Sequence, residues 1–167
     1  VLVWGNVPFL GEGLPTTELL KKVQDAGCLS VLAHPSRKEA WKVFDPDWVS
    51  YLLGIEYWNR KTDGWAPSPD APALLNDSGL KRFVGLDFHN HRQFFPLAMM
   101  MDTDGPVSEA SILAGLKASR CQPSAFGLSV SASSMQSLTS VLRTAEFFRR
   151  RLALLRRSIS RKYLTRK

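Results

Sequence analysis

The 167-residue chain is long enough for one domain of ordinary size. Its 44% hydrophobic and 22% charged residues are typical of globular proteins and exclude intrinsic disorder over most of the chain. No apolar run reaches the roughly 18–20 residues that a membrane-spanning helix needs. Two cysteines, Cys28 and Cys121, are too few for a disulfide framework, and the sequence has no CxxC pair of the kind that binds structural zinc.

The net charge of +7 is concentrated near the C-terminal end. Residues 143–167 hold ten Lys and Arg but only one acidic residue, Glu146, which gives this segment a charge of +9. The other 142 residues hold 12 basic and 14 acidic side chains and carry a charge of −2. The basic composition therefore indicates an anionic partner only for the last 25 residues.

Helices and strands are expected to alternate in the first part of the chain. The opening VLVWG is typical of a strand, and residues 15–18 indicate the start of a helix that ends at Gly27. The apolar run 29–33 predicts a buried strand. Because the chain opens inside a strand, without Met or a secretory signal, we expect a fragment that lacks an N-terminal part.

The middle of the chain repeats this alternation. The Asp-Pro-Asp at 45–47 predicts a helix that continues to Leu53, and a strand is expected over 55–58. Residues 59–72 contain three Pro and one Gly and predict a loop long enough to favour a functional role. The next elements expected are a short helix over 73–78, strands over 83–86 and 97–101, and a helix over 108–119 capped by Ser108.

Strands separated by helices of this length indicate parallel βαβ units and an α/β fold over residues 1–120. The Ser-rich stretch 121–136 is interpreted as a linker. Residues 137–167 are interpreted as a basic amphipathic helical tail, with apolar residues at helical spacing from Leu138 to Ile159. This stripe is expected to cover the body; the alternatives are an anionic membrane surface and the phosphates of a nucleic acid.

Three residues that can bind metals follow predicted strands. His34 comes directly after the strand 29–33, and Asp87 and His89 follow the strand 83–86. Alternate side chains of an extended segment share a face, so Asp87 and His89 are expected to point the same way. Carboxylate and imidazole donors suit zinc, manganese or iron, and active sites of parallel α/β folds gather at the carboxyl ends of the strands. We therefore predict metal ligands at His34, Asp87 and His89.

The stretches AGCLSVLAHPSR (26–37), GIEYWN (54–59) and VGLDFHNH (84–91), in this order, resemble the C-terminal half of the polymerase and histidinol phosphatase (PHP) family. The resemblance covers roughly residues 1–120. It implies the C-terminal part of a distorted, seven-stranded β/α barrel with a site for two or three metal ions. His34 matches the late ligand in the His-Pro motif, and Asp87 and His89 match the closing Asp-x-His pair. The earlier His-x-His of the family has no counterpart here, which supports the expectation of a fragment.

The resemblance implies metal-dependent hydrolysis of a phosphoester by the complete protein, with a phosphorylated small molecule or a nucleotide as substrate. Asp87 and His89 are then the expected catalytic residues, because the cations that they hold activate water and neutralise the phosphate. Arg37 and Arg92 are candidate phosphate ligands, and Glu56 a candidate substrate contact. The structural alternatives are solvated loop arginines for Arg37 and Arg92 and an exposed or paired strand carboxylate for Glu56.

Two other functions remain open at this point. One is a non-catalytic PHP-like remnant whose tail, residues 143–167, binds nucleic acid or an anionic membrane surface. The other is a metal-dependent hydrolase of the amidohydrolase type, which is also a β/α barrel. Without a signal or an apolar span, the protein is expected to be cytoplasmic.

Overall fold

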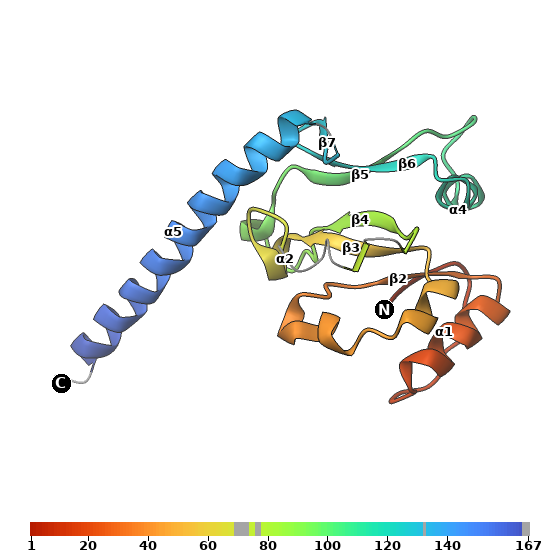
Figure 1. Cartoon of the computed structure of the whole chain (residues 1–167), viewed down its shortest axis with the longest axis horizontal. Coiled ribbons are helices and arrows are strands. Elements are labelled where there is room, and N and C mark those ends of the chain that lie inside the picture. The colour runs from red at the N-terminus through yellow and green to blue at the C-terminus, as the bar shows by residue number, and fades with distance from the viewer. Residues whose placement is uncertain (69–73, 76–77, 132, 165–167) are drawn as a thin grey trace.

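The computed structural model describes residues 1–68, 74–75, 78–131 and 133–164, and no side chains at 92, 133, 134 and 157–164. Its strands form two sheets (Figure 1). The first contains, in this order, β1 (Leu2–Trp4), β2 (Leu29–Leu32), β3 (Gly54–Asn59) and β4 (Lys81–Gly85). The second contains β5 (Leu97–Met101), β6 (Cys121–Ala125) and β7 (Leu128–Ser129).

Strands β2, β3 and β4 are parallel, whereas β1 is antiparallel to β2, and β5, β6 and β7 are antiparallel to one another. The mixed α/β class is therefore confirmed. The expected barrel does not close among the described strands, because β5 forms its ladder with β6 and adds no parallel strand to β4. The two sheets face each other with β4 and β5 as neighbours (Figure 1).

The α-helices are α1 (Thr16–Asp25), α2 (Arg60–Asp63), α4 (Glu109–Lys117) and α5 (Ser133–Leu164). Three 3₁₀ helices accompany them: η1 (Arg37–Val43), η2 (Pro46–Ser50) and η3 (His91–Gln93). Helix α1 buries Leu20 and Val23, which share one face at the spacing of a helical turn. As predicted, Ser108 caps α4, and its Oγ accepts a 3.1 Å hydrogen bond from the N–H of Ser111.

Two expected elements differ in the structure. The helix predicted over 45–53 shortens to η2, because the N–H of Leu53 already donates to the backbone oxygen of Ser30 in β2 and Gly54 begins β3. The predicted loop 59–72 begins with α2, since Asn59 at the end of β3 accepts a hydrogen bond from the N–H of Thr62 and starts a helical turn. Most of the helix expected over 73–78 lies outside the described residues.

The interpretation of residues 121–136 as a linker was wrong. This stretch forms β6, β7 and the start of α5, and its residues Ala125, Val130 and Met135 are buried. The serines hid the apolar alternation that would predict a strand. A small polar residue still fits a strand, because strands pair through backbone hydrogen bonds. Ser124, for example, is buried and lies opposite Ser129.

The core between the sheets is centred on Trp58, a fully buried side chain of β3. It packs with residues of both sheets and of α5, among them Val84, Leu97, Ala125 and Met135. Leu138 and Leu142 at the start of α5 border this cluster, so the first turns of the helix cover the body as expected.

Beyond these turns, α5 extends away from the sheets (Figure 1), and Phe148, Leu152 and Leu155 of its expected apolar stripe stay exposed, as does Val141 beside Leu142. The prediction that the whole stripe covers the body was therefore wrong, because the body ends before the helix does. None of the described helices combines the length and the apolar character that crossing a membrane requires.

Candidate functional site

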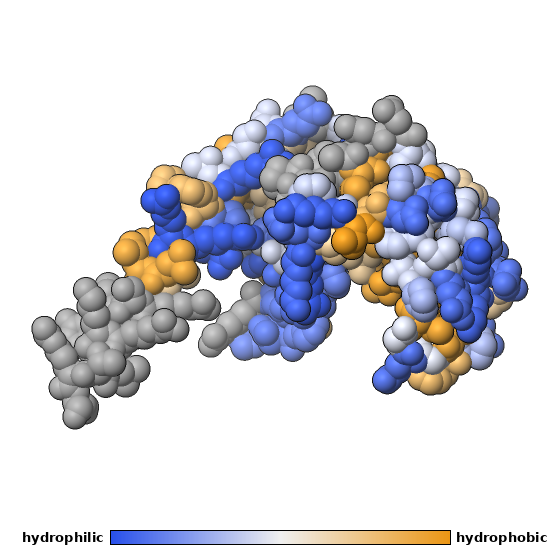
Figure 2. Space-filling view, turned by 60° about the horizontal axis from the view of Figure 1, so that its bottom comes forward, coloured by the Kyte–Doolittle hydropathy of each residue, from blue (hydrophilic) through white to orange (hydrophobic). Residues whose placement is uncertain are grey.

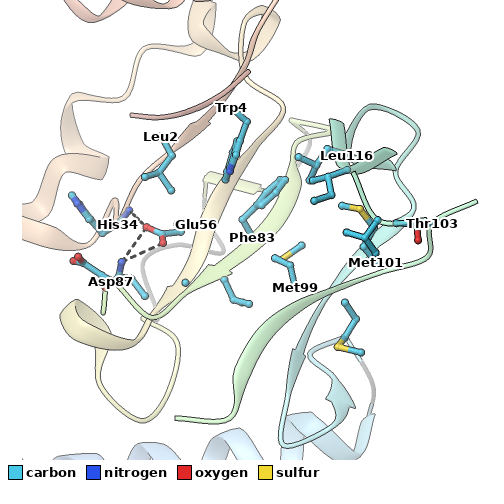
Figure 3. A pocket seen from close by; sticks show the side chains of 16 residues that line it. Leu2, Trp4, His34, Glu56, Phe83, Asp87, Met99, Met101, Thr103 and Leu116 are labelled. Carbon is cyan, nitrogen blue, oxygen red and sulfur yellow. Dashed lines mark hydrogen bonds between the residues drawn. The ribbon is translucent and has the colours of Figure 1, made fainter. Parts of the chain in front are cut away.

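A cavity of about 680 Å³ lies between the two sheets. Its polar residues include His34, Glu56, Asn59 and Asp87, which come from β3 and from the turns after β2 and β4. Figure 3 shows His34, Glu56 and Asp87 together at one end, and Phe83, Met101 and Leu116 toward the other. The cavity therefore has one polar end and one apolar wall.

The parallel order of β2, β3 and β4 explains why these polar residues meet. Parallel strands place their carboxyl ends at the same edge of a sheet. His34 follows β2 at this edge, Asn59 is the last residue of β3, and Asp87 follows β4. The sequence prediction that His34 and Asp87 occupy equivalent strand ends is confirmed by this arrangement.

Glu56 lines the cavity, is only 5% exposed and accepts hydrogen bonds with both of its carboxylate oxygens. Its Oε2 accepts a 2.7 Å hydrogen bond from the backbone N–H of His34, and both carboxylate oxygens accept from Nδ2 of Asn59 at 3.1 and 3.2 Å (Figure 3). Glycine at position 85 makes room for this carboxylate: a Cβ there would lie 2.2 Å from Oε1 of Glu56. Because both carboxylate oxygens accept hydrogen bonds from protein groups, Glu56 holds the backbone of His34 in place.

A second buried network lies beside Glu56. The N–H of Asn59 donates a 2.8 Å hydrogen bond to Oδ2 of Asp63, and the hydroxyl of Ser36 donates to Oδ1. Burial raises the pKa of Asp63 above its usual value, although these two hydrogen bonds act in the opposite direction. This network ties the turn after β2 to α2 and holds the edge of the cavity in place.

Lys61 lies between Asp87 and His89. Its ammonium Nζ is 2.9 Å from Nε2 of His89, and 3.4 and 3.5 Å from the two carboxylate oxygens of Asp87. The ring Nδ1 of His89 lies 2.7 Å from the backbone oxygen of Asp87 and 3.3 Å from its Oδ1. The expected pairing of Asp87 with His89 is therefore present, with a cationic group held between carboxylate and imidazole.

The local backbone differs from the extended conformation that predicted this pairing. Asp87 has a φ of 47°, and His34 has a φ of 29°, both in the left-handed region that favours glycine. Such a conformation in residues with side chains costs on the order of 1–3 kcal/mol and concentrates at functional sites. The turn at Asp87, and not strand alternation, brings its carboxylate to His89.

The other predicted site residues lie apart from this cluster. Arg37 in η1 is exposed and does not line the cavity. The side chain of Arg92 lies outside the described part of the chain. Within the described ranges, no three His, Cys, Asp or Glu side chains form a group that could hold a metal ion, so His34 is not gathered with Asp87 and His89 into one ligand set.

Sequence reasoning missed Lys61 and Asp63. Both belong to α2, which turns back toward the carboxyl edge of the sheet directly after β3. The signal was the Asn59 that ends the strand, since Asn at this position caps a helical turn and brings the next few side chains to the same edge.

Glu146, the only acidic residue of the segment 143–167, forms ion pairs with two arginines. Its carboxylate binds Arg149 at 2.6 and 2.7 Å and Arg150 at 2.6 Å, while Arg150 also donates to the backbone oxygen of Asp63 at 2.6 Å. Burial by itself would raise the pKa of Glu146, but the hydrogen bonds and charges of the two arginines outweigh it and lower the pKa to about 2. These contacts fasten the middle of α5 to α2.

Comparison of the sequence with protein-family models gave no match, and comparison with curated proteins gave none either.

Proposed function

We propose that the chain is the C-terminal part of a PHP-like domain and that the complete protein hydrolyses phosphoesters with divalent cations. The observation that carries this proposal is the Lys61 ammonium between the carboxylate of Asp87 and the imidazole of His89. Two donors that already converge on a positive charge suit a zinc, manganese or iron ion.

Asp87 and His89 would hold one cation, whereas His34 follows β2, which β3 separates from β4, and is not counted among the ligands of that cation. A bound cation would supply Lewis-acid chemistry, which activates water and neutralises phosphate charge. Glu56 serves this site by fixing the turn that carries His34, since its Oε2 holds the N–H of that residue. The buried hydrogen bond from the N–H of Asn59 to Asp63 holds α2 against the same edge of the sheet.

The shape of the cavity supports a substrate with an organic group beside its phosphate. Its polar end offers His34 and Asp87, whereas Trp4, Phe83 and Leu116 line its apolar wall. A phosphorylated small molecule or a nucleotide would place its phosphate at the polar end and its apolar or aromatic part against this wall.

Metal binding and hydrolysis test the proposal on the purified 167-residue chain. Mn²⁺ and Zn²⁺ are titrated calorimetrically into the wild type, into Asp87→Asn and His89→Ala, and into Asp25→Asn, a matched control on exposed surface. Hydrolysis of p-nitrophenyl phosphate is measured on the same samples.

The expected result is about one cation per chain, bound with an affinity that falls on the order of tenfold or more in Asp87→Asn and His89→Ala and stays unchanged in Asp25→Asn. Equal binding by all four proteins would overturn the assignment of these ligands. No binding of either cation by the wild type would overturn the metal site; because the proposed activity belongs to the complete protein, hydrolysis by this chain alone would add support but is not required.

A further inference from the structure

The solvent-exposed face of α5 combines an apolar stripe with a high positive charge. Val141, Phe148, Leu152 and Leu155 are between 58% and 65% exposed, although residues of these types are usually buried. At about 100° per residue, the four side chains fall within an arc of about 60° on the helix. They therefore form one continuous stripe, here called the apolar stripe of α5.

The apolar stripe points away from the body. Leu142 borders the core, Glu146 accepts a hydrogen bond from the backbone N–H of Trp65, and Arg150 links Glu146 to the backbone oxygen of Asp63 in α2. On a helical projection, Glu146 lies about 150° from the centre of the stripe. The contacts that hold α5 thus leave the stripe open to a partner.

Basic residues border this stripe. Arg151 and Arg156 are exposed and lie on either side of it on the same projection. Residues 143–167 carry ten basic side chains, and the only acidic one, Glu146, is already neutralised by two arginines. Figure 2 shows hydrophobic groups in orange beside hydrophilic groups in blue on the part of α5 next to its grey end.

We propose that α5 is a peripheral docking helix for an anionic lipid bilayer, with Phe148, Leu152 and Leu155 inserted between headgroups and the arginines bound to lipid phosphates and carboxylates. An anionic bilayer matches both the stripe and the charge. A nucleic acid would engage the arginines but leave the apolar stripe in water. A second copy would cover the stripe but bring two segments of charge +9 together.

The structure offers two variants of identical composition that separate the stripe from the rest of the helix. Phe148→Ser/Leu152→Ser removes two stripe residues that are 58% and 59% exposed. Phe147→Ser/Leu154→Ser removes one Phe and one Leu of similar exposure, 52% and 64%, on a different face of the same helix. Both variants change helix propensity equally, and far-UV circular dichroism checks that α5 persists in each.

Vesicle flotation with the full chain tests the proposal. Vesicles contain phosphatidylcholine alone or with about 30% phosphatidylserine. The wild type is expected to float only with the anionic vesicles, less so at high salt, because surface charge is screened. Phe148→Ser/Leu152→Ser is expected to weaken binding on the order of tenfold or more, and Phe147→Ser/Leu154→Ser about twofold or less.

Charge is tested in the same assay. Arg151→Gln/Arg156→Gln is expected to weaken flotation, whereas Lys21→Gln/Lys22→Gln on the exposed side of α1 is expected to leave it unchanged. Equal losses in the two serine variants, or no flotation of the wild type, would overturn the proposal. Salt-dependent binding of a DNA duplex by both serine variants, without flotation, would assign α5 to nucleic acid instead. Wild-type dimers in sedimentation equilibrium that Phe148→Ser/Leu152→Ser dissociates, without flotation, would assign the stripe to a second copy.

Discussion

The backbone N–H of His34 donates a 2.7 Å hydrogen bond to the carboxylate of Glu56, which joins the turn after β2 to the middle of β3. Because Glu56 is 5% exposed, this carboxylate depends on protein donors in place of water. The side chain of Asn59 supplies the others, so one buried acid organises the polar end of the cavity.

Glu56→Gln is expected to destabilise the fold by about 1–3 kcal/mol, because an amide nitrogen would then face the N–H of His34 or the Nδ2 of Asn59. Urea unfolding measures this change in the free energy of unfolding. Glu12→Gln, at an exposed position, serves as control and should change it by less than about 0.5 kcal/mol. Equal stability of both variants would show that the Glu56 contacts are energetically unimportant.

Gly85→Ala is expected to cost about 1–3 kcal/mol, because the added Cβ would collide with Oε1 of Glu56 at 2.2 Å. The cost should nearly vanish when Glu56 is already alanine, since the collision is with that side chain. A double-mutant cycle of Gly85→Ala and Glu56→Ala by urea unfolding measures this coupling. Additive effects would mean that Gly85 is required for another reason.

Lys61→Met is expected to raise the affinity for Mn²⁺ or Zn²⁺ on the order of tenfold, because it removes the ammonium group that lies between Asp87 and His89. Calorimetric titration compares it with the wild type and with Lys21→Met, an exposed lysine of α1. A lower or unchanged affinity of Lys61→Met for these metal ions would show that they do not bind at the position of the Lys61 ammonium.

Glu146→Gln is expected to remove a pH-dependent part of the stability. The pKa of Glu146 is lowered from 4.5 to about 2 in the folded chain, so the carboxylate stabilises the fold fully above pH 4.5 and loses this effect as the pH falls toward 2. Arg149 and Arg150 are about half exposed, so solvent screens their charges. We therefore expect this pH-dependent part of the free energy of unfolding to be on the order of 2 kcal/mol.

Urea unfolding at neutral and acidic pH measures this difference. The wild type should lose more stability on acidification than Glu146→Gln, while Glu109→Gln, at an exposed position of α4, should behave as the wild type. Parallel pH profiles of the wild type and Glu146→Gln would contradict a role of the arginine contacts in holding α5.

Local sequence signals predicted the elements that position the candidate site. The apolar run before His34 and the run before Asp87 became β2 and β4, because short apolar segments bounded by turn residues favour a strand locally. The parallel alignment of β2, β3 and β4 then followed from the helical connections between them. Because these strands were predictable, the sequence also predicted that His34 and Asp87 lie at strand ends.

Other features depended on contacts between distant parts of the chain. The sequence of β6, CQPSA, carries no apolar pattern, and the strand exists because its backbone pairs with β5. Lys61 reaches Asp87 only after α2 has turned back to the sheet edge.

The sequence by itself determined that α5 is an amphipathic, strongly basic helix, since spacing and charge are properties of the chain. Only the tertiary structure decided which part of its apolar face is buried. Leu138 and Leu142 meet the core, whereas Phe148 and Leu152 extend past it, because burial depends on where the body ends in space and not on the spacing of residues along the helix.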